Sequence, residues 1–576
     1  MPCLRSLACL ILCLSFATPA LAIDTYIVAG QSNGWRISHL KQGRGGAEKA
    51  PKVYYFGMDC VAEPESAKLV TLTALDEGTM GFALARALAE RHGKDVVFIQ
   101  YCRCGAPVLG TEINSWWPGE DPAGGKTYDQ GLFGRLQKYV ASVRSQVKEQ
   151  CSEELEIKGL FWHQGESNIA SDKAEFERAT KNLFGRFRSE FGADLPIVAG
   201  HIRDLGEGPR GINAAIDRIA AQDTNMLAVP LAGLQFEPDR DGKLDVHIAL
   251  PGCHELGRRM ARGLSALELR AIVTKAGGTV AFAADDPTRI TGVNLYNGNN
   301  PLKGKGGKNE EVTDVWLENL AGCTALKKLD LSNCSVTNEC LKRVGQLSSL
   351  EELNLSLTVI SDEGLRHLAE CTKLRVLGLA STQCTGSGFA HLGKLTGLEN
   401  VNFHYTPLDD AGLRAISQVG VKGRLWFAHT KFTDEGAKRL ADLKDLKTCG
   451  MGSTHPESSG KAVASLAGLP IEDLSLLDHQ ATAEGISHAA AIASLRRLDC
   501  SYAPKANDAA LALVAKLPRL EEFRIGGAGE ITDAGIAAFA ETKSLKKLVL
   551  HQLKKVSPEG IAELSKARPD LMIEVK

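Results

Sequence analysis

The stretch Asp24-Thr25-Tyr26-Ile27-Val28-Ala29-Gly30-Gln31-Ser32-Asn33 indicates how the N-terminal part of the chain folds. Its first six residues are rich in β-branched and apolar side chains, which are typical of a strand. Gly30 allows a sharp turn that presents Ser32 at the strand's carboxyl end, the edge where open parallel sheets bind ligands. A lone serine in a turn is more often a cap, so a catalytic role for Ser32 requires a general base elsewhere.

Further strand-like and helix-like runs alternate downstream of this stretch. Residues 80–92 have helical periodicity and are followed by Gly93, a helix stop signal. Strand-like runs cover residues 95–100, 157–162, 195–199 and 226–229. This alternation predicts a parallel sheet covered by helices on both faces, a flavodoxin-like three-layer α/β domain over residues 23–267.

The groups needed for ester hydrolysis occur in three separated strings. His247 can accept the proton of Ser32 and return it to the leaving alcohol, and Asp245 can orient the imidazole. The oxyanion that forms needs fixed hydrogen-bond donors. The backbone N–H groups of Ser32 and Gly105 and the side-chain amide of Gln164 are the candidate donors. The alternative is that Asp245 and His247 are ordinary surface residues.

These strings resemble the SGNH-type hydrolases, and within them the carbohydrate esterases that include sialate O-acetylesterases and acetylxylan esterases. The resemblance covers roughly residues 23–265 and rests on Gly30–Asn33, His163–Glu166 and Asp245–His247. It implies that Ser32 is the nucleophile, that Gln164 lies in the oxyanion hole, and that acetyl groups on a carbohydrate are the substrate. Gln31, Asn33, His163 and Glu166 are expected to support the site. Many relatives place the acid three residues before the histidine, where this chain has Leu244, so Asp245 is the less secure member of the triad.

Several metal-binding residue types also occur in this part of the chain, at His163, Glu166, His201, Asp204 and His254. Their spacing matches no zinc motif such as H-E-x-x-H. We therefore expect no metal and no cofactor.

The sequence beyond residue 268 repeats with a period of about 24 to 25 residues. The pattern L-x-x-L-x-L recurs at residues 326–331, 350–355, 374–379, 398–403, 495–500, 520–525 and 545–550, with weaker copies ending at Phe427, Met451, Leu476 and Val575. The pattern resembles a leucine-rich repeat array and predicts a curved solenoid over residues 268–576. Residues 280–283 are expected to form a capping strand, and residues of about 297–308 a mobile insertion that is either a hinge or a contact loop.

The residues between the leucines of each strand are expected to face the concave surface, the usual partner-binding face of a solenoid. Trp426, His404 and Arg424 are the candidate partner-binding residues, for a protein or a glycan. Trp426 is either an exposed anchor or a partly covered ring that packs against a neighbouring strand.

Composition excludes some functions. With 67 Lys and Arg against 69 Asp and Glu, the formal net charge is −2, which gives no general attraction to nucleic acid. Residues 1–22 read as a cleaved signal peptide, and no later run is long enough to span a membrane, so a secreted or periplasmic protein is expected. Export permits disulfides, for which Cys60, Cys102, Cys104, Cys151 and Cys253 are candidates, whereas the cysteines of the repeats are expected to be buried thiols.

Two functions are consistent with these patterns. The first is a secreted serine esterase that removes short acyl groups from an acylated carbohydrate, with the solenoid binding a partner or the substrate polymer. The alternative is a binding protein in which the repeats recognise a cell-surface protein or glycan and the α/β domain is an inactive scaffold. The nearly complete catalytic set favours the enzyme.

Overall fold

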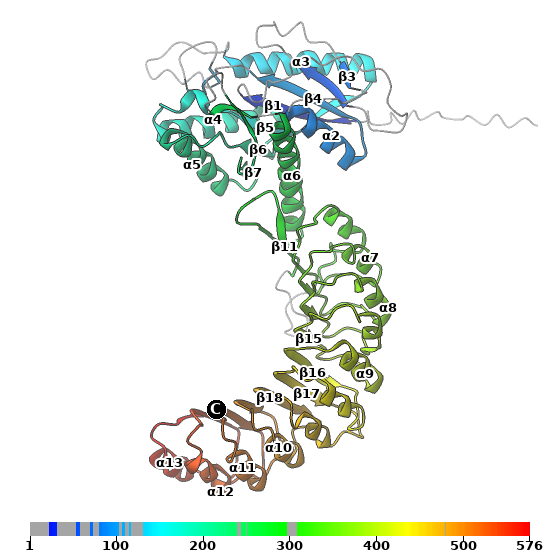
Figure 1. Ribbon diagram of the computed structural model, residues 1–576, viewed down its shortest axis with the longest axis vertical. Helices are drawn as coiled ribbons and strands as arrows, with labels where there is room; N and C mark the ends of the chain where they lie inside the picture. Colours follow the sequence, from blue (N-terminus) through cyan, green and yellow to red (C-terminus); the bar gives the residue numbers. More distant parts are fainter. Residues whose placement is uncertain are drawn as a thin grey trace, which may run out of the picture. The chain divides into compact units, whose positions relative to one another are not determined.

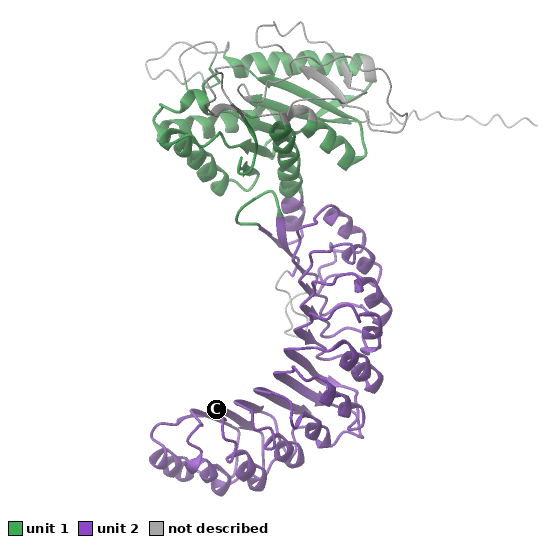
Figure 2. Cartoon of the chain, viewed as in Figure 1, with its two compact units in different colours: residues 1–268, 283–289 green, residues 269–282, 290–576 purple. Residues whose placement is uncertain are grey.

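The computed structural model describes residues 22–30, 53–57, 70–72, 80–102, 106–109, 115–116, 131–238, 244–248, 250–296, 308–478 and 480–576. The chain divides into two compact units, residues 1–268 with 283–289 and residues 269–282 with 290–576 (Figure 2). The division predicted between residues 267 and 268 falls inside one helix, α6 (Leu250–Lys275), so no break in secondary structure marks it.

Unit 1 is built on a seven-stranded sheet (Figure 1). The strands are β1 (Ala22–Gly30), β2 (Val53–Gly57), β3 (Val70–Leu72), β4 (Val96–Cys102), β5 (Glu154–His163), β6 (Ile197–Gly200) and β7 (Met226–Val229). Their order is β3-β2-β4-β1-β5-β6-β7, and every neighbouring pair is parallel except β2 with β3. Strand β1 therefore lies between β4 and β5.

Helices cover both faces of this sheet. They are α2 (Met80–His92), α3 (Leu132–Cys151), α4 (Lys173–Phe191), α5 (Glu207–Gln222) and α6. Alternate strand residues such as Ile27, Ile99 and Trp162 belong to one buried cluster with side chains of α3, α4 and α5. On the other face α6 packs closely against the sheet at two glycines. Leu264 of α6 lies over Gly159 of β5, and Val198 of β6 lies against Gly263 of α6. The predicted three-layer α/β fold is confirmed, including the bounds 80–92 and 226–229.

Unit 2 is a solenoid with one sheet along its inner face and short helical segments along its outer face (Figure 1). Its strands are β10 (Thr279–Phe282), β11 (Ile290–Asn294), β12 (Lys328–Asp330), β13 (Glu352–Asn354), β14 (Val376–Gly378), β15 (Asn400–Asn402), β16 (Arg424–Thr430), β17 (Thr448–Ser453), β18 (Asp473–Asp478), β19 (Arg497–Cys500), β20 (Glu522–Gly526), β21 (Lys547–His551) and β22 (Met572–Val575). Its α-helices are α7 (Cys340–Val344), α8 (Asp362–Leu365), α9 (Asp410–Val419), α10 (Ala483–Ala489), α11 (Asp508–Val514), α12 (Asp533–Ala537) and α13 (Pro558–Ala567).

The repeat strands pair in sequence order, and all pairs are parallel except β10 with β11. The register places Leu329, Leu353 and Leu377 side by side, and all three are buried. Each repeat can bury this apolar face only against its neighbours, which is why the stack is continuous. The leucine-rich repeat solenoid is confirmed, and the capping strand expected at residues 280–283 is β10, which turns out to be antiparallel to β11.

A ladder of carboxylates links successive repeats. Asp410, in the first turn of α9, accepts hydrogen bonds from the backbone N–H and the hydroxyl of Thr433 at 2.8 and 2.7 Å. Asp508 binds Thr532 in the same way, at 2.8 and 2.6 Å. Three residues after each threonine the chain has a glycine, Gly436 or Gly535, because the carboxylate leaves no room for a Cβ atom there. At Gly436 that atom would lie 1.9 Å from Oδ1 of Asp410.

We expect Gly436→Ala to lower the free energy of unfolding by about 1–3 kcal/mol, because the added methyl group displaces the Asp410 carboxylate from Thr433. Urea unfolding followed by circular dichroism measures this loss. Gly393→Ala is the control, since a Cβ atom at Gly393 meets nothing within 4 Å. Equal stability of the two variants would contradict the role given to the ladder.

The cysteines correct one prediction. Cys102 and Cys253, expected as disulfide candidates, are buried free thiols. Burial raises the pKa of the Cys102 thiol well above its usual range, so the sulfur is held as an unreactive thiol. Cys60 and Cys104 lie outside the described residues, as does the side chain of Cys151. In the repeats Cys334, Cys371, Cys384, Cys449 and Cys500 are buried thiols as expected, whereas Cys323 is partly exposed.

Among the described residues, no helix combines the length and the apolar character that crossing a bilayer requires.

Candidate active site

The carboxyl ends of four strands meet at one edge of the sheet in unit 1. Gly30 at the end of β1 is in register with Cys102 on β4 and with His163 on β5, and His163 is in register with Gly200 on β6. Ser32 follows β1 by two residues and Gly105 follows β4 by three. Both residues lie outside the described residues, as do Gln31 and Asn33. The strands that precede them, β1 and β4, nevertheless end at the same edge of the sheet as β5, which Gln164 directly follows.

The side chain of Gln164 is buried and tied to the segment that follows β4. Its Nε2 atom donates to the carbonyl oxygen of Ala106 at 3.1 Å and to Oδ1 of Asn168 at 3.0 Å. An amide nitrogen has two hydrogens, so both are used in this structure. Gln164 therefore holds the residue next to Gly105, and its own role as an oxyanion donor remains a prediction.

Asn168 is a buried residue at the centre of this network that the sequence analysis did not single out. Its Oδ1 atom accepts from the backbone N–H of Val108 at 2.7 Å as well as from Gln164, and its Nδ2 donates to the hydroxyl of Ser171 at 3.0 Å. It ends η2 (Glu166–Asn168), the single helical turn that also contains Glu166. Its place four residues after Gln164 is the only sequence signal for this role.

Aromatic packing fixes the same segment from a second side. The ring of Trp116 meets that of Trp162 on β5 edge-on, with centroids 5.0 Å apart, and the backbone N–H of Trp116 donates to Pro107 at 3.0 Å. Both indole rings are fully buried. Hydrogen bonds and packing thus define the position of residues 106–108, which directly follow Gly105.

Gly165 is required at the turn after β5. Its φ is +155°, a region that side chains disfavour, and a Cβ atom would lie 2.6 Å from the side chain of Ile212. Only glycine can therefore occupy the position between Gln164 and Glu166.

His163 is a core residue rather than an exposed catalytic group. The ring is fully buried, and a Cβ atom at Gly200 would lie 2.7 Å from it. Burial is the main reason why its pKa is lowered from the usual 6.5, although Glu166 acts in the opposite direction. His163 is therefore neutral at pH 7 and supports the end of β5 by packing.

The lowered pKa of His163 predicts acid sensitivity. Below pH 6.5 the unfolded chain binds a proton at this residue and the folded chain does not, so the stability is highest above that pH. We expect the free energy of unfolding to fall by about 1.4 kcal/mol per pH unit from this residue until its lowered pKa is reached. Urea unfolding at several pH values measures the slope. His163→Gln should reduce it, whereas replacement of the exposed His391 by Gln should not.

Asp245 and His247 lie on β9 (Leu244–Ile248), which pairs antiparallel with β8 (Phe236–Pro238). The structure has a short hairpin here, between β7 and α6. Cross-strand pairing outside the main sheet was not visible in the residue pattern. The side chains of Asp245 and His247 lie outside the described residues, so their geometry toward Ser32 stays a prediction.

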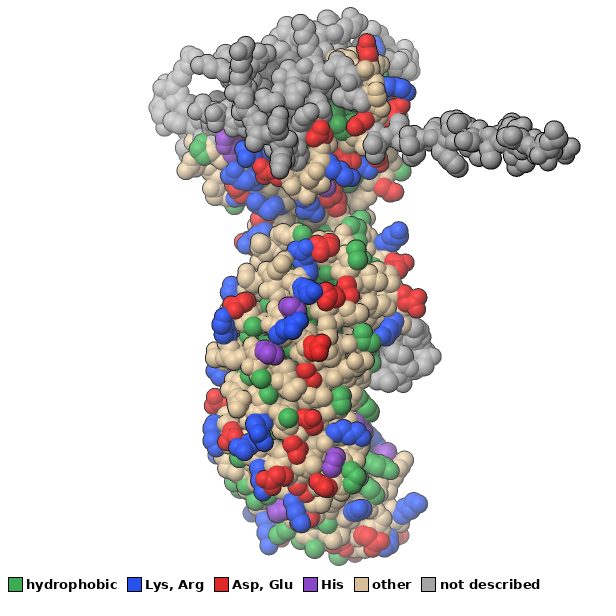
Figure 3. Space-filling model, turned by 90° about the vertical axis from the view of Figure 1, so that its right-hand side faces the viewer, with side chains coloured by type: hydrophobic (Ala, Val, Ile, Leu, Met, Phe, Trp, Pro, Cys, Tyr) green, Lys and Arg blue, Asp and Glu red, His purple; other side chains and the backbone are tan. Residues whose placement is uncertain are grey.

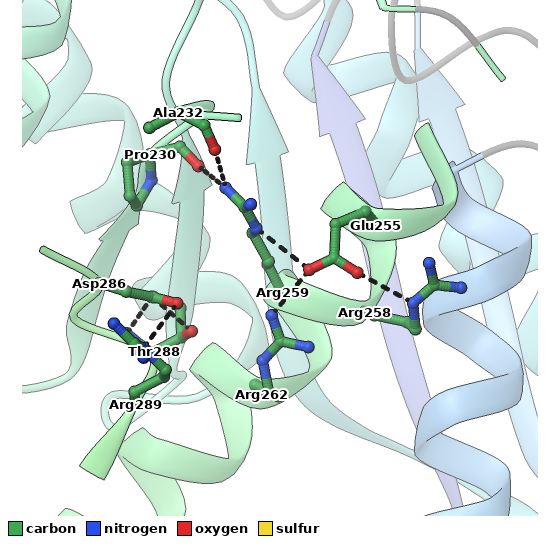
Figure 4. Close-up of polar contacts among 9 residues, drawn as sticks. All are labelled: Pro230, Ala232, Glu255, Arg258, Arg259, Arg262, Asp286, Thr288 and Arg289. Atoms are coloured by element: carbon green, nitrogen blue, oxygen red, sulfur yellow. Dashed lines mark hydrogen bonds and ion pairs between the residues drawn. The ribbon is translucent and has the colours of Figure 1, made fainter. Parts of the chain in front are cut away.

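Polar contacts join the first turns of α6 to the segment that follows β7 (Figure 4). Arg259 of α6 donates to the carbonyl oxygens of Pro230 and Ala232 at 2.9 Å each, which ties the helix to the chain that follows β7. Glu255 accepts from Arg258, Arg259 and Arg262. Partial burial raises the pKa of Glu255, but the hydrogen bonds from Arg262 and Arg258 outweigh it and the net pKa is lowered. The carboxylate is thus a charged anchor at neutral pH.

The other residues considered as metal ligands have separate partners. His201 contacts Asp217 at 2.8 Å, and Asp204 accepts from Arg210 at 3.0 Å. No group of three or more possible ligands comes together within the described part of the chain.

The concave residues of unit 2 lie on neighbouring strands. Trp426 is partly covered: its ring lies over Gly450 of β17, where a Cβ atom would come within 1.9 Å of the indole. The ring of His404 is 5.7 Å from that of Trp426, centroid to centroid. Arg424 is exposed at the start of β16. The ring thus packs against a neighbouring strand and stays partly exposed, and a partner-binding role for Trp426 remains a prediction.

A mostly parallel sheet with helices on both faces defines unit 1 as a three-layer α/β domain, and unit 2 is a leucine-rich repeat solenoid. Residues 22–266 match the family described as carbohydrate esterase, sialic acid-specific acetylesterase, and residues 346–369 match a leucine rich repeat. The chain thus carries a domain of this carbohydrate esterase family, followed by leucine-rich repeats.

Solved structures resemble one unit or the other. A protein from Arabidopsis thaliana is 18% identical, with 42% of this chain and 98% of that chain covered and a TM-score of 0.30. A carbohydrate acetylesterase from Xanthomonas citri is 12% identical, covering 45% and 60%, with a TM-score of 0.33. An internalin from Listeria monocytogenes is 19% identical, covering 54% and 89%, with a TM-score of 0.36. No curated protein matches the sequence.

Proposed function

We propose that this protein is a serine esterase that removes acetyl groups from hydroxyls of a carbohydrate, with the repeats binding the substrate polymer or a partner. The match of residues 22–266 to a carbohydrate esterase family carries the proposal. The strands β1, β4 and β5 also support it. They end in register at one edge of the sheet, and the segments proposed to carry Ser32, Gly105 and Gln164 follow them in the sequence.

In the proposed mechanism Ser32 attacks the ester carbonyl while His247 takes its proton, and Asp245 holds the imidazole in the required tautomer. The bond between the acyl carbon and the sugar oxygen then breaks, and His247 protonates that oxygen, which leaves as a hydroxyl group. Water then attacks the acetyl-enzyme with His247 as the base, which releases acetate and restores Ser32. The backbone N–H groups of Ser32 and Gly105 bind the oxyanion.

In this mechanism Gln164 positions Ala106, the residue after Gly105 in the sequence, by the hydrogen bond from its Nε2 atom. For its own amide to bind the oxyanion, one of its two hydrogen bonds must be exchanged for one to the substrate. Gln31, Asn33, His163 and Glu166 support the turns around the site. Neither a metal nor a cofactor takes part in the proposed steps.

We also propose that residues 1–22 direct export, so that the enzyme acts on extracellular or periplasmic carbohydrate. The small residues Ala20 and Ala22 after an apolar run are typical of a cleaved signal peptide. Sequencing the N-terminus of the protein recovered from the culture medium or the periplasm tests this point.

The test of the activity is acetate release from acetylated xylan, acetylated pectin and O-acetylated sialic acid. We expect release from at least one of them and covalent labelling of Ser32 by a fluorophosphonate. Absence of both, with retained binding of a glycan or a protein, would show that the α/β unit is an inactive scaffold.

A further inference from the structure

The concave face of unit 2 contains a groove of about 620 Å³ over its first repeats. Its floor includes Asp330, Asn354, Gly378, Asn400 and Asn402, and Trp426 lies at its last repeat. This volume is within the range of about 300–1,000 Å³ that is usual for small-ligand sites. All lining residues belong to the same compact unit.

The floor of the groove is formed by one register position of successive strands. Asn294, Asp330, Asn354, Gly378, Asn402 and Trp426 are consecutive partners in the parallel ladder. Gly378 lies beneath the side chain of Asn354, because a Cβ atom at Gly378 would lie 2.5 Å from Oδ1 of Asn354. Three asparagines and one aspartate, interrupted by Gly378, thus follow one another along the solenoid up to an indole ring.

The charged side chains that line the groove already have partners within unit 2. Lys328 forms an ion pair with Glu352 at 2.7 Å. Asp330 accepts from the backbone N–H of Ser332 at 2.9 Å and from Nδ2 of Asn354 at 3.2 Å. A charged ligand would have to break such pairs, so the groove favours a neutral one.

The remaining groups match a sugar. Within the described part of the chain, no hydrogen bond engages the side chain of Asn400 or the Nδ2 atom of Asn402. An amide both donates and accepts, which is what a row of hydroxyl groups requires. The indole of Trp426 offers a flat apolar surface on which the C–H face of a sugar ring can stack.

The indole is held in place before any ligand binds. Gly450 lies beneath the ring, and His404, fixed by the backbone N–H of Ala428 that donates to its Nδ1 at 3.1 Å, lies beside it. A preorganised aromatic ring loses little conformational entropy on binding.

Other surfaces of unit 2 lack this combination. Arg497 pairs with Asp473 and Lys547 with Glu574, so the later repeats present compensated charges on the same face. The face of helical segments shows Lys and Arg mixed with Asp and Glu and no broad apolar area among the described residues (Figure 3).

We infer that the groove from Asp330 to Trp426 is a binding site for a neutral polysaccharide, which it holds by hydroxyl groups and ring stacking. The choice of a polysaccharide rests in part on the proposed esterase function. Because the groove contacts hydroxyls and ring faces, binding does not require acetyl groups, and the site would keep hold of the polymer after deacetylation.

Affinity electrophoresis of the full chain in gels containing deacetylated xylan or mixed-linkage β-glucan tests this inference. We expect retardation by at least one of these neutral polymers, and no retardation by polygalacturonate, which is anionic. Trp426→Ala should weaken binding at least about tenfold, and Asn402→Ala should weaken it as well. Tyr502→Ala is the control, since Tyr502 is 67% exposed and lies outside the groove.

Circular dichroism and esterase assays on a small aryl acetate keep the outcomes distinct. Retardation that Trp426→Ala abolishes supports the inference even if the wild-type chain has no esterase activity, in which case the proposed function fails. Failure of both neutral polymers to retard an active wild-type chain overturns the inference and leaves the esterase standing. Equal retardation of Trp426→Ala and wild type, or specific binding of a protein to the groove in place of the polymers, also overturns it.

Discussion

Ser32→Ala should lower kcat for an aryl acetate by about 10⁴- to 10⁶-fold while KM changes little, because the nucleophile acts in the chemical step rather than in substrate binding. Ser32 follows Gly30 in the sequence by two residues, and Gly30 is in register with Cys102 at the end of β4 and with His163 at the end of β5. The residual rate of the variant would come from the oxyanion donors alone. Stopped assays of acetate release over hours are sensitive enough to measure it.

The control for this prediction is Ser167→Ala. Ser167 is an exposed serine in η2, three residues after Gln164, so its loss alters the same region without removing the proposed nucleophile. We expect Ser167→Ala to keep wild-type activity and fluorophosphonate labelling. If Ser32→Ala and wild type hydrolyse the ester at the same rate, Ser32 has no part in the mechanism.

The sequence predicted those parts of the fold that depend on local pattern. The helix 80–92 and the strand 226–229 have the expected bounds because apolar periodicity and a stop signal occur within the segment itself. The strand expected at 157–162 is longer, Glu154–His163, because pairing with β1 continues beyond the apolar run to exposed residues. Pairing partners far along the chain set these ends.

The parts of the site that the sequence could not predict depend on contacts between distant segments. Asn168 and Val108 are 60 residues apart, and nothing near either residue indicates the hydrogen bond between them. The carboxylate ladder of the repeats is similar, since Asp410 looks like an ordinary first-turn acid until Thr433 is placed beside it. The hairpin that carries Asp245 and His247 pairs outside the main sheet and leaves no strong alternation in the sequence.

Asn168→Ala should lower kcat by about 10²-fold, the second-largest effect we expect in this protein. Asn168 is not itself a predicted catalytic residue. It acts as a positioning residue, because its Oδ1 atom accepts hydrogen bonds from Val108 and Gln164. Its loss leaves the backbone N–H of Val108 and one N–H of Gln164 buried without an acceptor, at a cost of about 1–3 kcal/mol for each unsatisfied group. The segment that follows Gly105 can then shift, and a displacement of about 1 Å of an oxyanion donor is enough for a loss of this size.

Three measurements separate positioning from a general loss of stability. Asn168→Asp keeps the acceptor for Val108 and should recover part of the activity, which a purely steric role would not produce. Asn309→Ala is the matched control: Asn309 is also a buried asparagine, with two hydrogen bonds to carbonyl oxygens, but it lies in unit 2, so its variant should unfold more easily and keep its kcat. KM should change little in Asn168→Ala, because the displaced donor binds the oxyanion of the transition state more strongly than the ester carbonyl. A variant that loses stability but retains wild-type kcat would show that Asn168 holds the fold together without positioning Gly105.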